Sequence, residues 1–440
     1  MRDAPARRTI EGRGRKGSFD MNLALNAHDI EPADVRRRFA WARRQGNPAW
    51  LWPDIAPDRW RAALTRLETV VRQVLAGESV SEALDGDPEA LGLAGYTSGV
   101  GPLLGYWIEQ NIVPASPEVA AMFALHLAHN RIRVERMTSE AIGVAQALAA
   151  QGIACTLLKG LHTAHAYFPE PGTRPASDID LLVAASDEAA AGEILRACGF
   201  VAGKKGRWEC DWRRPSVPTE PRSLSFVHAD DPWSIDLHIS LNVQVSAGAP
   251  VTRLDEALST AESPPSQSPR WRVEARAQVL AQPLSLIQLA VHAGSGLQNL
   301  TLLRLVELCL VIRRDGTAGT LDWDAFLATA AKIHALALVY PALKLCDQLV
   351  PDTVPARVLE RCGEKAPIAV RRIVDRLTPA SAQRVDRCSV AEHFMWADSW
   401  RGRAFQVLVD IGAPLAQPWP RLWSIYEVRA WRLFRRTVTR

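Results

Sequence analysis

Two aspartates, Asp178 and Asp180, stand one residue apart at the start of the apolar run SDIDLLV. An alternation of polar and apolar residues is typical of a short buried strand, and on such a strand both carboxylates point to the same side. Two carboxylates held side by side near a core repel each other, and burial makes their charge costly. The pair therefore predicts a site for a divalent cation on this strand.

Two further motifs supply chemistry on either side of this pair. The apolar segment 153–160 predicts a first strand, and it ends in Lys159 and Gly160. A later alternating segment places Asp236 and His238 on one face of another strand. Mg²⁺ prefers carboxylate oxygens and nucleotide phosphates as ligands, and two such ions stabilise the attacking and leaving oxygens of a phosphoryl transfer. Three aspartates and a nearby lysine fit that chemistry.

In this order, the motifs resemble those of the DNA polymerase β nucleotidyltransferase superfamily, in which a glycine turn and helix precede an Asp-x-Asp strand and a third acid. The chain resembles more closely an uncharacterised bacterial nucleotidyltransferase family whose first motif is Lys-Gly rather than Gly-Ser. The residues that match are Lys159, Gly160, Arg174, Asp178, Asp180, Asp236 and His238. The resemblance implies an α+β fold, with a small mixed-sheet, polymerase β-like nucleotidyltransferase core flanked by N- and C-terminal helical regions.

The resemblance also implies an activity. A Mg²⁺-dependent enzyme of this kind transfers a nucleoside monophosphate from an NTP, here expected to be ATP, to an acceptor hydroxyl and releases pyrophosphate. Two Mg²⁺ ions are expected: Asp178 and Asp180 would hold the ion that carries the triphosphate, and Asp180 with Asp236 would hold the ion that activates the acceptor. All three aspartates are thus expected to be catalytic metal ligands.

Five further residues are expected to contact the nucleotide or support the metal ligands: Lys159, Gly160, Arg174, Ser177 and His238. Gly160 would let the backbone approach the triphosphate, while Lys159 and Arg174 would supply positive charge. His238 would orient Asp236 or contact the acceptor. The resemblance also places three residues further along the chain at the nucleotide cleft: His292, Arg304 and Glu307.

Departures from the superfamily pattern leave other functions open. Leu161 occupies the place of the serine after Gly160, and the interval from Gly160 to Asp178 is longer than usual. This favours an alternative, a catalytically weak or inactive nucleotide-binding protein of regulatory or antitoxin-like type. A glycosyltransferase that holds a nucleotide sugar through Mn²⁺ is a third alternative, which predicts a larger Rossmann-like sheet. Taken alone, an Asp-x-Asp pair is also a common solvated strand end, and His238 an ordinary core histidine.

At 440 residues the chain is longer than one hydrophobic core usually supports, so we expect two or three domains. Helical periodicity dominates both ends of the chain and gives way to strand-like patterns in the middle. We expect five segments: a disordered basic tail (1–20), an N-terminal helical region (21–150), the nucleotidyltransferase core (151–257), a Ser/Pro-rich linker (258–274) and a C-terminal helical domain (275–440).

Within the core, the pattern predicts a helix over 161–168, a Pro/Gly turn over 169–175, and then the strand of the aspartate pair. A helix with Ser186 as its N-cap and Gly199 at its end follows. The segment SLSFVHA (223–229) predicts a further strand. These elements form a small α/β unit that positions the motifs.

Charge and cysteine usage bear on partners and compartment. The net charge of +4 suits anionic ligands such as nucleotides, but no large basic patch is evident, so a small-molecule, peptide or protein acceptor is expected ahead of nucleic acid. Seven singly placed cysteines argue against a zinc ribbon or a disulfide framework and predict the cytoplasm. The sequence has no run of about 18 apolar residues, so no membrane association is expected.

Overall fold

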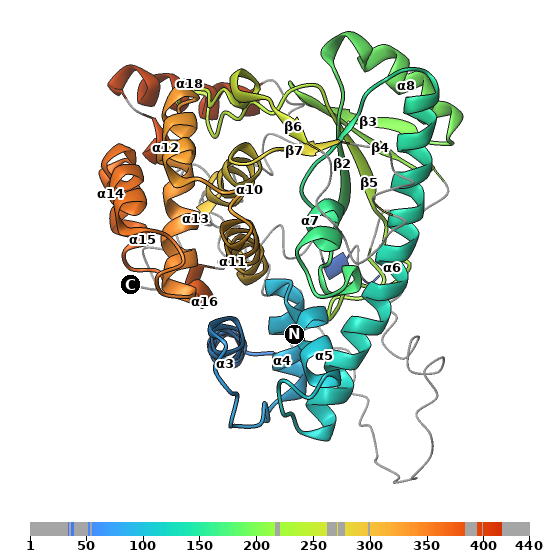
Figure 1. The fold of residues 1–440 in the computed structure, drawn as a ribbon, viewed down its shortest axis with the longest axis vertical. Coiled ribbons are helices and arrows are strands. Elements are labelled where there is room, and N and C mark those ends of the chain that lie inside the picture. The colour runs from blue at the N-terminus through green and yellow to red at the C-terminus, as the bar shows by residue number, and fades with distance from the viewer. Residues whose placement is uncertain are drawn as a thin grey trace, which may run out of the picture.

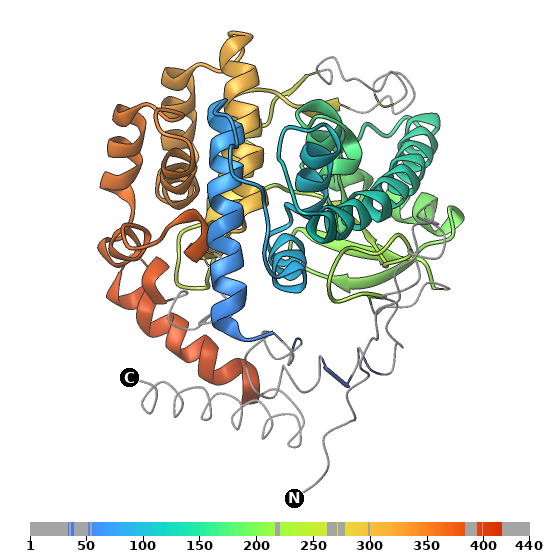
Figure 2. The ribbon, with the colours of Figure 1, turned by 90° about the horizontal axis from the view of Figure 1, so that it is seen from below.

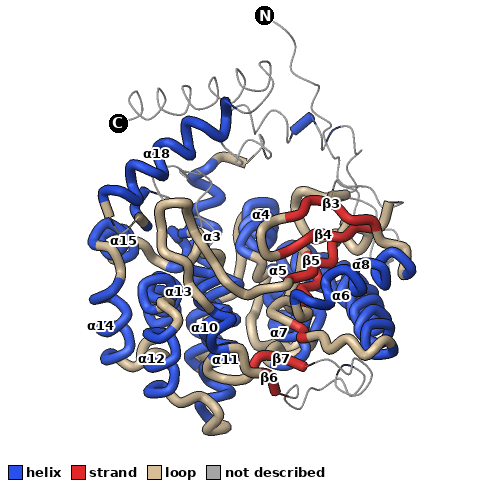
Figure 3. Tube along the Cα trace, turned by 90° about the horizontal axis from the view of Figure 1, so that it is seen from above, coloured by secondary structure: helices blue, strands red, loops and turns tan. Residues whose placement is uncertain are grey.

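The computed structural model describes residues 52, 55–215, 221–261, 271, 278–297, 300–382, 394–397 and 399–415, together with Asp34, Arg37 and Arg38. The predicted basic tail, residues 1–20, lies outside the described residues. In the described part, the strands gather on one side of the molecule and the C-terminal helices on the other (Figure 3).

A mixed sheet forms the centre of the core (Figure 1), with the spatial order β3-β4-β5-β2-β1-β7-β6. Its strands are β1 (Thr156–Leu157), β2 (Asp178–Leu182), β3 (Val201–Lys205), β4 (Glu209–Arg213), β5 (Ser234–His238), β6 (Thr260–Ala261) and β7 (Gln278–Leu280). The pairs β2–β5 and β1–β7 are parallel and the others antiparallel. This sheet confirms the predicted α+β class and differs from the parallel sheet that the glycosyltransferase alternative requires.

Helices precede and follow the sheet, as predicted. Those before it are α3 (Pro57–Ala76), α4 (Pro88–Ser98), α5 (Gly101–Glu109) and α6 (Pro117–Ala150). Those after it are α10 (Leu284–Gly294), α11 (Leu302–Thr317), α12 (Trp323–Lys332), α13 (Leu336–Leu349), α14 (Ala356–Lys365), α15 (Ile368–Val374), α16 (Pro379–Ala382) and α18 (Trp400–Leu415). Among the residues described, none of these helices combines the length and apolar character needed to cross a membrane.

Two hydrophobic clusters hold these elements together. In one of them, Ile179, Leu181, Ile235 and Leu237 of β2 and β5 pack with residues of α6 and of α8 (Glu188–Ala197). Because side chains alternate along a strand, this packing turns the aspartates to the opposite face of the sheet. The other cluster joins α3, α4 and α5 to the C-terminal helices, and α3 packs against α11 and α16 (Figure 2).

The elements between β1 and β2 agree with the prediction. The helix α7 (Leu161–Ala166) falls within the expected range 161–168. The Pro/Gly turn that follows contains a short 3-10 helix, Pro171–Thr173. The chain therefore leaves β1, makes one short helix and one turn, and returns to the sheet at Asp178.

The predicted strand over 223–229 is wrong, because this segment forms a loop. Asp231 accepts hydrogen bonds from the backbone N–H groups of Arg222 and His228, at 2.6 and 2.8 Å. Such side-chain bonds to the local backbone compete with strand pairing. Phe226 is fully buried, so its apolar character reflects loop packing rather than a place in the sheet.

The start of α8 also differs from the prediction. Ser186 lies in a short 3-10 helix (Ala185–Asp187), and Asp187 is the N-cap, without a capping side-chain hydrogen bond. The Ser186 hydroxyl lies 3.4 Å from Asp187 Oδ1 instead. The end of the helix agrees with the prediction, since Gly199 has a φ of +88°, the left-handed conformation that glycine adopts most easily.

The sheet continues past residue 257, the predicted C-terminal boundary of the nucleotidyltransferase core. β6 pairs with β7, and β7 pairs with β1, so the segment assigned to a linker (258–274) begins with a strand. Trp271, in the same segment, is 1% exposed and belongs to the cluster beneath the sheet. Strands of two or three residues carry too little alternation to be recognised. The division into domains otherwise stays a prediction.

Candidate active site

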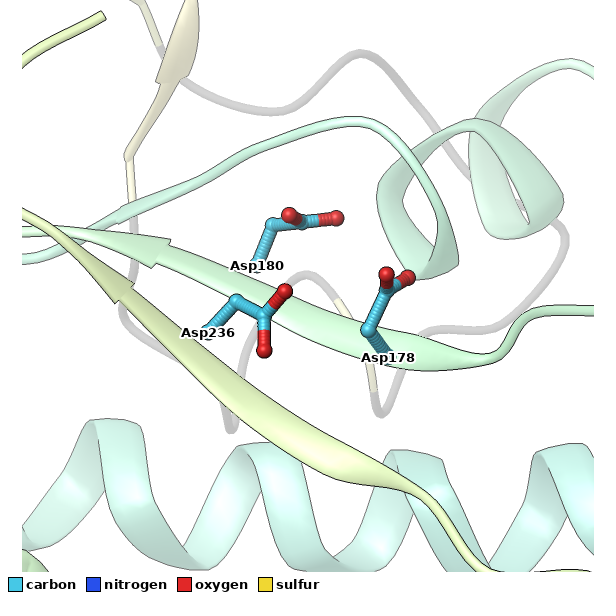
Figure 4. A group of neighbouring side chains, drawn as sticks. All are labelled: Asp178, Asp180 and Asp236. Atoms are coloured by element: carbon cyan, nitrogen blue, oxygen red, sulfur yellow. The ribbon is translucent and has the colours of Figure 1, made fainter. Parts of the chain in front are cut away.

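The register of β2 and β5 brings the three aspartates together. These parallel strands pair Asp180 with Asp236 and Asp178 with Ser234, so the polar side chains share one face. One oxygen from each aspartate lies within 4.8 Å of the others. Figure 4 shows the three carboxylates on one side of the strands and a helix on the other. This is the spacing that a shared cation requires.

Asp180 lies at the centre of the group, with a side chain that is only 1% exposed. Its Oδ1 lies 3.1 Å from Lys159 Nζ and 3.1 Å from His238 Nε2. Its Oδ2 is buried and has no hydrogen-bond partner. Burial opposes the charge, but Lys159 and His238 outweigh it and hold the Asp180 pKa well below its usual range. The result is an ionised carboxylate with one oxygen left free for a ligand.

The other two carboxylates resist ionisation. Burial, followed by the charges of Asp178 and Asp180, raises the pKa of Asp236 to about 6, although the Ser234 hydroxyl donates to Asp236 Oδ1 at 3.0 Å. Burial and Asp180 likewise raise the pKa of Asp178. A divalent cation would remove this repulsion, and carboxylate oxygens are the ligands that Mg²⁺ prefers. Together with the unpartnered Asp180 oxygen, the residues fit a Mg²⁺ site.

The Lys-Gly turn lies directly in front of this group. Leu158 N donates to the backbone oxygen of Asp180 at 3.1 Å, which fixes the turn against β2. Gly160 adopts φ +55° and ψ −111°, a conformation essentially restricted to glycine. A Cβ at Gly160 would lie 3.7 Å from Asp180 Oδ2. Burial disfavours the charge of Lys159, yet Asp180 and Asp178 outweigh it and raise the Lys159 pKa.

The helices α10 and α11 contribute further ionisable side chains near the three aspartates. Arg174 donates from Nε to Glu307 Oε1 at 2.8 Å, and Arg304 donates to the backbone oxygen of His292 at 3.3 Å. Burial lowers the pKa of Arg304, which also interacts electrostatically with Glu307, Arg174 and Asp178. Burial, together with nearby cationic side chains, lowers the His292 pKa well below its usual value. The three residues that the resemblance places at the cleft therefore lie beside the aspartates.

Two predicted residues behave differently from the rest. His238 contacts Asp180 rather than Asp236, so the first of its two expected roles, orienting Asp236, is not the one found, and contact with the acceptor stays a prediction. The reason is the register, which places His238 opposite Leu182 and diagonally next to Asp180. Ser177 is exposed, and its side chain hydrogen-bonds Asp178, which offsets part of the rise in the Asp178 pKa that burial and Asp180 cause.

Sequence reasoning missed two supporting residues. The Ser234 hydroxyl donates to Asp236. Ser234 stands two residues before Asp236, so the alternation of a strand could have predicted that the two side chains share a face. Glu209 Oε2 lies 3.4 Å from His238 Nδ1, across the β4–β5 pair. Glu209 had no signal, because β4 is absent from the prediction.

Among the described residues, the three aspartates are the one group of three or more His, Cys, Asp or Glu side chains spaced for a metal ion. The histidines next to the Lys-Gly turn do not add to it. Burial lowers the pKa of His162 to about 3 and that of His165 to about 4, so both are neutral at physiological pH. Neither histidine belongs to the metal-spaced group, and the His165 ring stacks on Trp271 with 4.4 Å between ring centroids, so we assign both histidines to the packing of α7.

A mixed sheet with three clustered aspartates beside a Lys-Gly turn is the arrangement expected of a nucleotidyltransferase from the sequence motifs. A family model described as an uncharacterised nucleotidyltransferase matches residues 88–351, more than half of the chain, and the chain belongs to this family. The match extends from α4 to the residues after α13, so it includes all the site residues described above, from Lys159 to Glu307. No curated protein and no solved structure matches the chain.

Proposed function

We propose that the protein is a Mg²⁺-dependent enzyme that transfers a nucleoside monophosphate from an NTP, with ATP as the expected donor, to an acceptor hydroxyl and releases pyrophosphate. The observation that carries this proposal is the geometry of Asp178, Asp180 and Asp236, whose oxygens lie within 4.8 Å of one another. The buried, unpartnered Oδ2 of Asp180 supports it, because a buried carboxylate oxygen without a donor is costly unless a cation binds there. Membership of the nucleotidyltransferase family supports it as well.

Each aspartate has a proposed role. Asp178 and Asp180 would hold the ion that accompanies the triphosphate, and Asp180 with Asp236 would hold the ion at the acceptor. Bound Mg²⁺ neutralises phosphoryl oxygens and lowers the pKa of a coordinated hydroxyl. Lys159 and His238 both approach Oδ1 of Asp180, so they keep the other oxygen turned toward the cation.

Positive side chains beside the aspartates suit the phosphates of the donor. Lys159 comes from the glycine turn, Arg174 from the segment before β2, and Arg304 from α11. Burial lowers the pKa of Arg304, and the nearby charge of Arg174 lowers it further. A bound polyanion relieves the repulsion between the two guanidinium groups, and a guanidinium group binds phosphate oxygens through two parallel hydrogen bonds. We assign these three side chains and the Gly160 backbone to the triphosphate.

The acceptor proposed first is a small molecule, followed by a peptide or protein side chain and then by nucleic acid. Contact with a nucleic acid backbone relies on many basic side chains. The chain has 52 Lys and Arg residues against 48 Asp and Glu, which gives no such excess.

One observation favours the alternative of a nucleotide-binding protein without turnover. Leu161 stands where the superfamily has a serine hydroxyl, and the nearest hydroxyl on α7 does not replace it. That hydroxyl, of Thr163, lies 3.0 Å from the Gly160 carbonyl oxygen and donates to Glu307. A nucleotide would then bind through Lys159 and the arginines, without efficient transfer.

Calorimetry with each NTP and Mg²⁺, followed by measurement of pyrophosphate release with candidate acceptors, separates the two functions. The proposed enzyme releases pyrophosphate, and Asp178→Ala, Asp180→Ala and Asp236→Ala each abolish the release in folded protein. Asp231→Asn is the matched control, because Asp231 is buried as well but both of its oxygens accept backbone hydrogen bonds, from Arg222 N and His228 N. Unchanged nucleotide consumption in the alanine variants contradicts the proposal. Tight NTP binding without release supports the alternative.

A further inference from the structure

Two buried acids on α11 contact α7 or the residue that ends it, and they have different partners. Glu307 and Asp315 are 4% and 5% exposed. We infer that Glu307 is a positioning residue for the triphosphate site: it holds Arg174 and the Gly160 turn in one arrangement without contacting the nucleotide itself. This inference rests on the proposed function and extends it to a residue on the C-terminal helices.

The contacts of Glu307 join three separate parts of the chain. Its Oε1 accepts the hydrogen bond from Arg174 Nε at 2.8 Å, and the two side chains are 5% and 10% exposed. The same oxygen accepts a hydrogen bond from the Thr163 hydroxyl of α7. That hydroxyl also lies 3.0 Å from the carbonyl oxygen of Gly160. One carboxylate on α11 therefore fixes both elements proposed to bind phosphate.

The direction of the Arg174 guanidinium supports this role. Glu307 occupies Nε, while Nη1 donates to the backbone oxygen of Pro175 at 3.1 Å. Nη1 also lies 4.0 Å from the position that a Cβ on Gly160 would occupy. The far edge of the guanidinium thus faces the space beside the turn. A guanidinium held in place before binding loses less conformational entropy when an anion arrives.

Asp315 provides a comparison on the same helix. It accepts hydrogen bonds from the Tyr167 hydroxyl at 3.0 Å and from the Gln282 side-chain amide at 2.5 Å. Tyr167 caps the end of α7, whereas Thr163 lies within that helix. Both acids thus tie α7 to α11, but the hydrogen bonds of Asp315 come from neutral groups and those of Glu307 include Arg174.

The test compares Glu307→Gln with Asp315→Asn. Both substitutions keep the side-chain volume and remove the charge. Each protein is titrated by calorimetry with the NTP that wild type binds best and with the corresponding NMP, in Mg²⁺. Because Glu307 acts on the phosphate-binding arginine, Glu307→Gln is expected to weaken NTP binding about tenfold, the loss of one charge-assisted hydrogen bond, and to leave NMP binding unchanged. Asp315→Asn is expected to lower the melting temperature and to leave both affinities unchanged.

Two further variants decide whether the effect passes through Arg174. In an Arg174→Gln background, Glu307→Gln is expected to weaken NTP binding less than it does in wild type, since only its contact with Thr163 and the Gly160 turn then remains. Thr163→Val removes the hydroxyl that contacts both Glu307 and the Gly160 carbonyl oxygen and leaves the Glu307–Arg174 ion pair in place. It serves as the comparison if Glu307→Gln does not fold, and it is expected to weaken NTP binding and to leave NMP binding unchanged.

Several outcomes overturn the inference. Equal NTP affinity in wild type and Glu307→Gln, an equal loss for NTP and NMP, or additive losses with Arg174→Gln would each show that Glu307 only supports the fold. If wild type binds no NTP, the proposed function fails and the inference fails with it. Failure of the inference alone is distinguishable, because wild type then still binds NTP.

Discussion

Two buried aspartates, Asp180 on β2 and Asp231 in the loop before β5, are 4% and 6% exposed but differ in their partners. Each oxygen of Asp231 accepts one backbone hydrogen bond, from Arg222 N or His228 N. Asp180 has Lys159 and His238 at one oxygen and nothing at the other. Burial is the same, and the difference lies in how completely the carboxylate is satisfied.

This difference separates a structural acid from a candidate functional one. The surroundings of Asp231 are complete, because its two oxygens close a loop against the backbone. The surroundings of Asp180 are incomplete, because two more carboxylates share the space before its free oxygen. Native proteins rarely leave a buried polar atom unsatisfied. The comparison therefore supports the proposal that a cation binds at the free oxygen of Asp180.

The largest expected effect comes from Asp180→Asn, which removes the charge and keeps the shape. We expect nucleotidyl transfer to fall by about a thousandfold, roughly 4 kcal/mol, because the metal ligand shared by both ions is lost. Stability is expected to change far less. Pyrophosphate release and urea denaturation measure the two quantities. If transfer persists near the wild-type rate, Asp180 is structural and resembles Asp231.

Adding Mg²⁺ tests the same contrast through stability. The pKa of Asp236 is raised to about 6 in the folded protein, whereas an aspartate in an unfolded chain has a pKa of about 4. The protonated Asp236 therefore contributes fully to the stability of the metal-free protein below about pH 4, and this contribution is lost as the pH rises through about 6. Mg²⁺ binds the ionised carboxylates, so it competes with protons at this site. We expect Mg²⁺ at a hundred times its dissociation constant to stabilise the protein by about 2.7 kcal/mol at pH 8 and by much less at pH 5.

Thermal unfolding with and without Mg²⁺ at a series of pH values measures this effect. Asp180→Asn is the control, because it is expected to abolish the Mg²⁺ shift at every pH. A shift of equal size at pH 5 and pH 8 would indicate binding at other groups.

Asp231→Asn gives the complementary result. An asparagine keeps one acceptor and turns an NH₂ group toward a backbone N–H that Asp231 now binds, either Arg222 N or His228 N. We expect a loss of about 1–2 kcal/mol in the free energy of unfolding, the cost of a buried donor without an acceptor. Urea denaturation measures the loss. Mg²⁺ and NTP affinities are expected to stay within about twofold of wild type, and a larger change would mean that the loop belongs to the site.

Local patterns were sufficient to predict the parts of the site that depend on a few neighbouring residues. Alternation along 177–183 and 233–241 predicts strands with Asp178, Asp180 and Asp236 on defined faces, and β2 and β5, which lie within these segments, confirm it. The helix after Gly160 follows from the same local reasoning. The faces were predictable because side chains alternate along a strand, so the apolar residues that face the core fix the face of every other residue.

The rest depends on pairings that a local pattern does not contain. The partner of His238 is set by the β2–β5 register, which no residue within either strand specifies. The approach of Glu307 to Arg174 joins positions 133 residues apart. The family resemblance placed Glu307 at the cleft, but the ion pair itself required the packing of α11. Short strands such as β6 and β7 were missed for lack of length.

The smallest expected effect, and the finest test of the space before Asp180, is Gly160→Ala. A Cβ there would lie 3.7 Å from Asp180 Oδ2, on the side proposed for the cation, and the φ of +55° adds strain of about 1–2 kcal/mol. Gly77→Ala is the matched control, because Gly77 has a φ of +75° and no atom within 4 Å of its Cβ position. We expect both substitutions to lower stability, Gly160→Ala by more, because its ψ of −111° lies outside the left-handed helical region that Gly77 occupies with a ψ of 16°. A weaker Mg²⁺ shift is expected only in Gly160→Ala. If Gly160→Ala retains the full Mg²⁺ shift, the cation does not bind on this side of Asp180.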